Sequence, residues 1–84
     1  MTGKRRNWHR AWSRLPNGRL RHISGAEFVV TRGAGFTDID AAPETLAEFQ
    51  TFEMARGVPV HDLAQRLIRL AREAVEWLAQ EAAK

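Results

Sequence analysis

The chain has 84 residues, a length that fits one small domain. Hydrophobic residues make up 44% of the sequence, and its Leu, Ile, Val and Phe content exceeds that typical of a disordered chain. The absence of cysteine excludes a disulfide scaffold, a thiolate metal site and a cysteine nucleophile. No apolar run approaches the ~18 residues of a membrane-spanning helix, and the basic N-terminus lacks the apolar stretch of a secretory signal. We therefore expect a cytoplasmic protein that does not enter a membrane.

The net charge of +3 is the sum of two segments of opposite sign. Residues 1–26 contain seven basic residues and no acid, whereas residues 27–84 contain six basic and ten acidic residues. A basic block of this density is typical of a segment that binds a polyanion such as nucleic acid. Two alternatives are a solvated tail and a surface that pairs with the protein's own acidic residues.

The first hairpin is predicted around Pro16-Asn17-Gly18. Proline presets the first dihedral of a turn, and Asn-Gly tolerates positive φ. After this turn, residues 19–23 alternate apolar and basic side chains, which is typical of a half-buried strand. Residues 4–15 before the turn fit either an amphipathic helix or a strand, and the hairpin turn favours a strand over residues 10–15.

Two further strands are predicted after a break at Ser24-Gly25. Residues 26–31 are rich in β-forming residues, and residues 36–40 follow a turn at Gly33-Ala34-Gly35. Together with the first hairpin, these segments predict a small antiparallel β-meander over about residues 10–40.

The second half of the chain predicts two helices. Pro43 suits a first helical turn, and Gly57 is a helix stop. From Pro59 to the end no helix breaker occurs, which predicts a helix of about 24 residues, roughly 36 Å long. Its apolar positions form two adjoining stripes, the first with Val60, Leu63, Leu67, Leu70, Ala74 and Trp77, the second with Ala64, Ile68, Ala71, Val75 and Leu78.

The expected fold is therefore α+β, a small antiparallel β-meander (about residues 10–40) followed by two antiparallel α-helices packed on one face. We expect residues 1–84 to form a single domain, with residues 1–9 as a basic N-terminal arm.

The length of the second helix predicts a partner interface. Strands of five or six residues measure about 17–20 Å, so a helix of roughly 36 Å overhangs them by two to three turns. Val75, Trp77 and Leu78 fall in this overhang, where they would meet a second copy or another protein. The alternative is that the sheet, the first helix or the N-terminal segment covers them.

Catalytic and metal sites are not predicted. His9, His22 and His61 lack metal-ligand spacing, and the chain contains neither a nucleophile elbow nor a phosphate-binding loop. We expect a protein that is not an enzyme and that holds no metal or cofactor.

Tryptophan and arginine alternate in the basic block, a pattern that favours single-stranded nucleic acid, because aromatic rings stack on bases while arginine neutralises phosphate. The alternative is that at least one tryptophan closes the core of a small domain. The primary hypothesis is a non-catalytic nucleic-acid-binding module, and its rival is a protein-interaction or assembly module that uses the long C-terminal helix. The candidate nucleic-acid-binding residues are Arg5, Arg6, Trp8, Arg10, Trp12, Arg14, Arg19 and Arg21.

Overall fold

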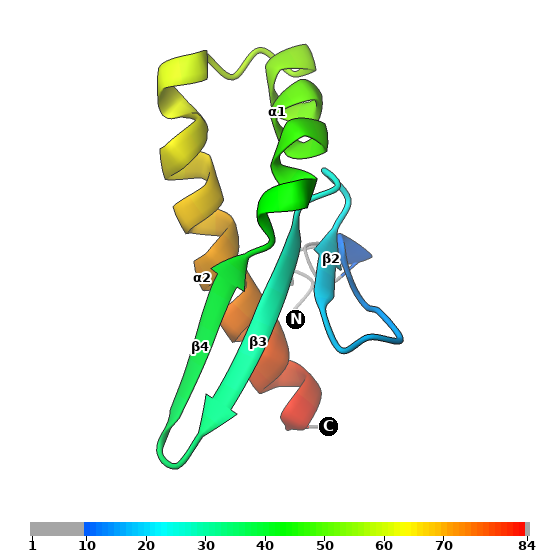
Figure 1. Ribbon diagram of the computed structural model, residues 1–84, viewed down its shortest axis with the longest axis vertical. Coiled ribbons are helices and arrows are strands. Elements are labelled where there is room, and N and C mark those ends of the chain that lie inside the picture. Colours follow the sequence, from blue (N-terminus) through cyan, green and yellow to red (C-terminus); the bar gives the residue numbers. More distant parts are fainter. Residues whose placement is uncertain (1–9, 84) are drawn as a thin grey trace, which may run out of the picture.

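The computed structural model describes residues 10–83, so the predicted arm at residues 1–9 lies outside it. Within this range four antiparallel strands form one sheet in the order β1-β2-β3-β4, and two helices follow along the chain (Figure 1). The predicted α+β fold with a small meander is therefore confirmed. The strands are β1 (Trp12–Arg14), β2 (Leu20–His22), β3 (Glu27–Gly33) and β4 (Phe36–Ala41).

The first hairpin forms at the predicted turn. Gly18 has a φ of +90°, which lies in the left-handed region that glycine adopts without steric cost. The side-chain oxygen of Asn17 accepts a 2.9 Å hydrogen bond from the Arg19 N–H and so supports the same turn. β1 then pairs with β2, with Trp12 opposite His22. The strand predicted over residues 10–15 is confirmed for Trp12–Arg14.

The second hairpin is longer and joins β3 to β4 through Gly35, whose φ is +80°. Side chains alternate between the two faces of the sheet, as the two-residue period of a strand requires. Phe28 and Val30 point toward the core, whereas Val29 and its cross-strand partner Asp40 lie on the outer face. The outer face carries exposed side chains along this hairpin.

Both predicted helices are present, each preceded by a short 3-10 turn. η3 (Pro43–Thr45) leads into α1 (Leu46–Ala55), and η4 (Val60–Asp62) leads into α2 (Leu63–Ala82). Gly57, with a φ of +95°, ends the first helix as predicted. No helix within residues 10–83 is both long and apolar enough to cross a membrane.

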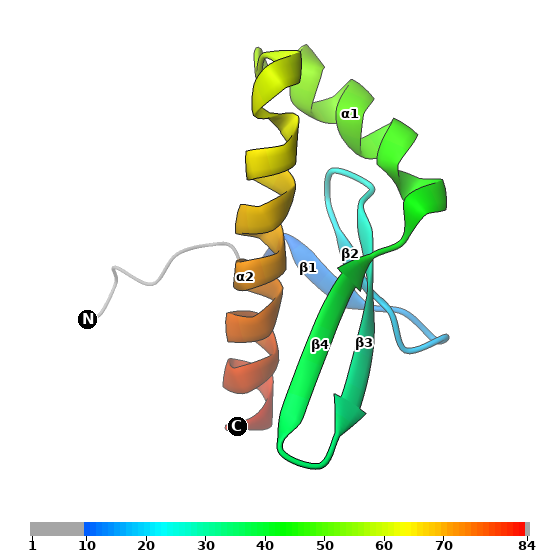
Figure 2. The same cartoon turned by 60° about the vertical axis from the view of Figure 1, so that its left-hand side comes forward.

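The helices occupy different positions on the sheet. α2 lies along one face of it, whereas α1 lies across its end, inclined to α2 and with the opposite chain direction (Figures 1 and 2). No helix within the described residues covers the outer face (Figure 2). The core lies between the sheet, α1 and the inner side of α2, and its buried members are Trp12, Leu20, Ala26, Phe28, Phe49, Leu63, Leu70, Ala74, Trp77 and Leu78.

Candidate interaction surfaces

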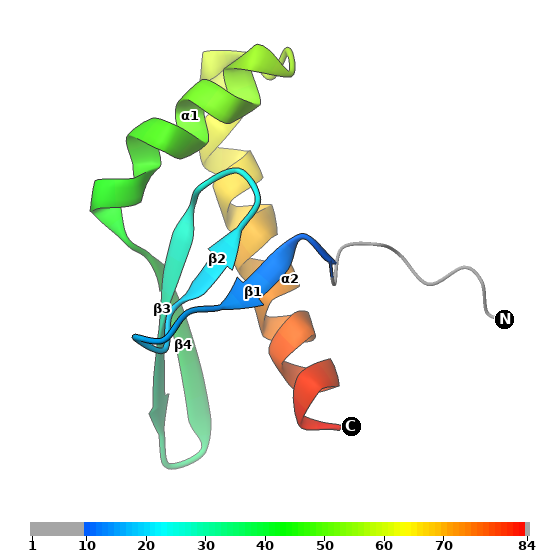
Figure 3. The ribbon, with the colours of Figure 1, turned by 90° about the vertical axis from the view of Figure 1, so that its right-hand side faces the viewer.

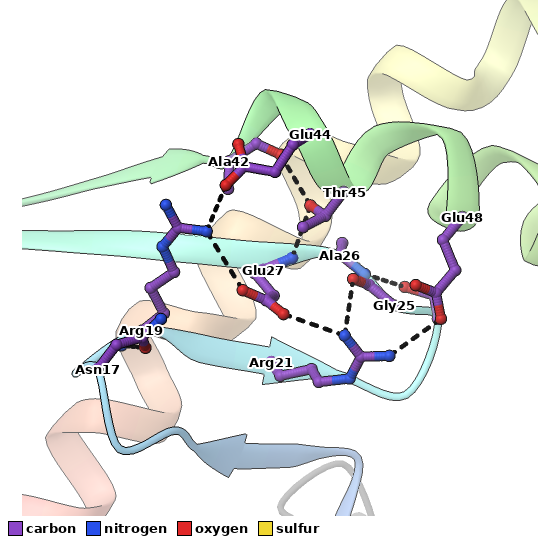
Figure 4. Close-up of polar contacts among 11 residues, drawn as sticks. Asn17, Arg19, Arg21, Gly25, Ala26, Glu27, Ala42, Glu44, Thr45 and Glu48 are labelled. Carbon is purple, nitrogen blue, oxygen red and sulfur yellow. Dashed lines mark hydrogen bonds and ion pairs between the residues drawn. The ribbon is translucent and has the colours of Figure 1, made fainter.

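Arg19 and Arg21 lie at the outer face of the sheet, where carboxylates from three elements surround them (Figure 4). Arg19 Nη1 is 2.7 Å from Glu44 Oε2 and 3.3 Å from Glu27 Oε1. Arg21 Nη1 is 3.1 Å from Glu27 Oε2, and its Nη2 is 2.9 Å from Glu48 Oε2. Glu27 of β3 therefore bridges the two guanidinium groups. Glu44 of η3 pairs with Arg19, and Glu48 of α1 pairs with Arg21.

In this network both arginines are paired with carboxylates of the same chain. Three carboxylates face two guanidinium groups, so the cluster as a whole carries a charge of about −1 near pH 7. The hydrogen bond from Arg19 holds the pKa of Glu44 below its ordinary value. Because Arg21 and Glu48 are 27 positions apart in the sequence, the ion pair also connects β2 to α1. For Arg19 and Arg21 the structure therefore supports pairing with the protein's own acidic residues.

Trp12 is part of the core. Its side chain is 4% exposed, and its ring centroid lies 4.9 Å from that of His22 and 5.6 Å from that of Phe28. The expectation that Trp12 stacks on nucleic-acid bases is therefore wrong, because an aromatic ring can stack on a base only if its face reaches solvent. A domain of this size needs a large side chain to close its core, and Trp12 supplies it.

Arg10 and Arg14 are the two exposed cations of the predicted nucleic-acid surface within the described residues. The Arg14 guanidinium lies 5.8 Å from the ring centroid of Trp77, which places β1 beside the C-terminal half of α2 (Figure 3). Three further candidates, Arg5, Arg6 and Trp8, lie outside the described residues.

Two groups of buried polar side chains occur, one between the helices and one in the sheet. The Glu53 side chain of α1 is fully buried and accepts hydrogen bonds from Arg66 of α2, from Nε to Oε1 at 3.1 Å and from Nη2 to Oε2 at 3.3 Å. His22 is also buried, and its Nδ1 accepts a 3.2 Å hydrogen bond from the N–H of Ser24. Burial of the imidazole lowers the pKa of His22 to about 4, despite the opposing effect of the Glu53 carboxylate.

We assign these buried polar side chains a structural role. His22 is neutral at pH 7 and buried in the core, and Glu53 is held by Arg66, so neither group is presented to a substrate in solution. Within residues 10–83, no group of three His, Cys, Asp or Glu side chains could hold a metal ion.

A surface pocket of about 470 Å³ lies at the turn between α1 and α2. Arg56, Arg66 and Arg69 line it, together with Asp62. However, Arg56 Nη1 is 3.7 Å and Arg66 Nε is 3.1 Å from the buried Glu53 carboxylate. Two of the three arginines therefore share one carboxylate, and together with Asp62 and Glu53 the three arginines keep a net charge of about +1 near pH 7.

The outer face of α2 and the preceding turn carries an exposed apolar stripe. Val60, Ile68 and Val75 are 67%, 48% and 47% exposed, and Ala64 and Ala79 lie on the same line of the helix surface. At its N-terminal end the stripe borders a groove of about 330 Å³ between α1 and α2. Leu46, Phe49, Gln50, Val60, Leu63, Ala64 and Leu67 line this groove.

The predicted partner patch at Val75, Trp77 and Leu78 is only partly present. Trp77 and Leu78 are 7% and 6% exposed and belong to the core, so their assignment to a partner interface is wrong. The reason is that the β3–β4 hairpin runs alongside the C-terminal half of α2 and removes the expected overhang (Figure 2). Val75 points away from the sheet and is the exposed member of the three.

Sequence reasoning missed the Glu53–Arg66 pair. The two residues are 13 positions apart on different helices, so no local motif joins them. The available indication was an acid beside Phe49 and Phe52 on the apolar side of α1. Ala64, Ile68 and Val75 were recognised as one stripe, but the sequence could not show which of the two stripes of α2 faces the sheet.

Comparisons with protein-family models, with curated proteins and with solved structures gave no match for this chain.

Proposed function

We propose that this protein is a non-catalytic protein-interaction module whose contact surface is the outer face of α2. The observation that carries the proposal is the exposed apolar stripe formed by Val60, Ala64, Ile68, Val75 and Ala79, hereafter the α2 stripe. Contiguous apolar surface of this kind marks interaction sites on soluble domains. The same helix supplies the core through its opposite side, so the stripe is presented on a rigid support.

The position of the stripe also supports an interaction role. Ile68 and Val75 are β-branched and lie seven positions apart, about two helical turns, so they form two anchors roughly 10 Å apart. Ala64 lies one turn before Ile68, and Ala79 one turn after Val75. Small residues at these positions allow a partner helix to approach the α2 backbone closely, while the β-branched residues fill the space between the helices.

Site-specific photo-crosslinking in cells tests this function. Ile68 is replaced by p-benzoyl-phenylalanine, and the matched control carries the same replacement at Thr31, an exposed residue of the outer sheet face. We expect a discrete protein adduct from position 68 and none from position 31. The absence of any adduct at position 68, with the variant folded and abundant, would overturn the proposal.

A second candidate is contact with nucleic acid through the N-terminal segment. It is supported by the exposed cations Arg10 and Arg14 and by the absence of acids in residues 1–26. Arg19 and Arg21 do not contribute to this candidate, because their guanidinium groups are already paired with glutamates.

Salt-dependent binding to generic DNA and RNA tests this second candidate. Replacing Arg10 and Arg14 by Gln removes two phosphate contacts, which flattens the slope of log K against log salt by about 2 units. Arg32→Gln, on the exposed part of β3, is the matched control and leaves the slope unchanged. No binding by the parent at low salt would eliminate this candidate.

A further inference from the structure

We propose that the partner of the α2 stripe is a second copy of this chain, bound with the two α2 helices antiparallel. This inference rests on the interaction function proposed above and specifies its partner. Three features of the structure carry it: the symmetry of the stripe, the charge distribution beside it, and the fit between its two ends.

The stripe is suited to pairing with itself in an antiparallel arrangement. A two-fold axis near Ala71 brings Ile68 of one copy beside Val75 of the other, and Ala64 beside Ala79. The two members of each pair lie at equal distances on either side of this axis along the helix. Within residues 64–79 each β-branched residue then meets a β-branched residue and each alanine meets an alanine, while Val60 lies opposite Ala83 of the second copy. A two-fold contact needs such a self-complementary surface.

Charge complementarity fixes the direction of the two helices. The exposed residues Arg69, Arg72 and Glu76 lie along one flank of the stripe. A two-fold axis across the helix pair places this flank of one copy against the same flank of the other, running in the opposite direction. Arg69 then lies beside Glu76 of the second copy, and the same contact repeats on the other side of the axis, whereas Arg72 lies next to the axis, opposite Arg72 of the second copy. A parallel two-fold pair would instead set this flank against the opposite flank of the second copy, around Leu67 and Leu78, where no such charge pair forms.

The two ends of the stripe also match. The N-terminal end borders the apolar groove of about 330 Å³ between α1 and α2, whereas the C-terminal end carries the small side chains of Ala79 and Ala82. In the antiparallel pair, the narrow C-terminal end of one helix lies over the groove of the other. A helix of 20 residues is about 30 Å long, so the contact falls at the small end of specific interfaces. We therefore expect a dissociation constant in the micromolar range.

Complementary charge variants give the sharpest test. In R69E/R72E the flank of each copy is entirely acidic, and in E76R it is entirely basic. Each variant alone has like charges across the two-fold axis, whereas a mixture of the two restores opposite charges. All three side chains are exposed, so we expect both variants to keep the parent's circular dichroism spectrum and melting temperature. Arg32→Glu, which reverses one exposed charge on β3, is the control.

Sedimentation equilibrium from about 5 to 300 µM measures the association. We expect the parent and the Arg32→Glu control to dimerise, each complementary variant to dimerise at least about tenfold more weakly, and the equimolar mixture to form a heterodimer. A parent that stays monomeric to the highest concentration overturns self-association. A dimer unaffected by either variant also overturns the proposal, since its interface lies elsewhere.

Disulfide trapping tests the direction independently, and it is simple here because the chain has no cysteine. Mixing I68C with V75C should yield a cross-linked heterodimer in excess of either homodimer, since these positions face each other only in the antiparallel pair. An excess of homodimers contradicts that arrangement. In the photo-crosslinking experiment, an adduct of twice the monomer mass identifies the second copy. An adduct of another mass refutes the self-partner while leaving the interaction function intact.

Discussion

Acidification is expected to destabilise this protein through His22. The imidazole is buried against the ring of Trp12, and its pKa is lowered from an ordinary 6.5 to about 4. Between these two pH values the unfolded chain binds a proton that the folded chain does not. Because stability rises with pH wherever the unfolded state binds more protons, this contribution is fully lost only below pH 4 and is fully present above pH 6.5.

The size of the effect follows from the same two values. A difference of about 2.5 pKa units at 1.36 kcal/mol each gives a total loss of about 3 kcal/mol across the window. At pH 5 the His22 imidazole is almost fully protonated in the unfolded chain and mostly neutral in the folded chain. The loss of unfolding free energy at this pH is about 2 kcal/mol. For a domain of this size that is a large fraction of the total free energy of unfolding.

Urea unfolding of the parent and of His22→Asn at pH 7.5 and pH 5 measures this loss. The asparagine oxygen can accept the Ser24 N–H in place of Nδ1, but asparagine carries no charge at either pH. We expect the variant to be less stable than the parent at pH 7.5, since the packing on Trp12 is lost. At pH 5 the difference in unfolding free energy between parent and variant should be about 2 kcal/mol smaller than at pH 7.5, because only the parent loses stability through this group.

The difference between parent and variant removes the contributions of other groups, which titrate alike in both proteins. His61→Asn makes the same substitution at an exposed histidine on η4 and is the matched control. If the gap between parent and His22→Asn stays constant to within about 0.5 kcal/mol, a reasonable precision for such extrapolations, the assignment of a neutral buried imidazole is refuted.

Three further changes test the packing. Leu70→Ala removes a fully buried side chain at the centre of α2 and should lower the free energy of unfolding in urea by about 2–5 kcal/mol. Ile68→Ala on the stripe should lower it by well under half of that amount. Equal losses in the two variants would contradict the orientation of α2. Glu53→Gln leaves Arg66 without its carboxylate and should lower the free energy of unfolding by about 3 kcal/mol. Part of this loss should be recovered when Arg66 is also replaced by Gln. A single variant as stable as the parent would show that the pair does not stabilise the fold. Gly35→Ala meets open space but keeps a φ of +80°, so it should lower the melting temperature through about 1–2 kcal/mol of backbone strain, and an unchanged melt would contradict that φ.

The order and type of the secondary-structure elements could be predicted from the sequence because they depend on local chemistry. The turn at Pro16-Asn17-Gly18 and the stop at Gly57 rely on the backbone freedom of glycine, which acts within a few residues. The alternation in residues 19–23 similarly fixed which side chains of β2 share a face. Each of these features needs no information from a distant segment.

Only the tertiary structure decided which side chains remain available to a partner. Arg21 is part of a basic block in the sequence, but the fold brings Glu48 to it from 27 positions away. Trp12 and Trp77 lie far apart in the chain, and the same core buries both. The stripe that contains Ile68 is exposed because the sheet covers the other side of α2, and the length of the β3–β4 hairpin determines how far that cover extends. Local propensity determines each element, whereas exposure depends on how the elements pack, and that packing involves contacts across the whole chain.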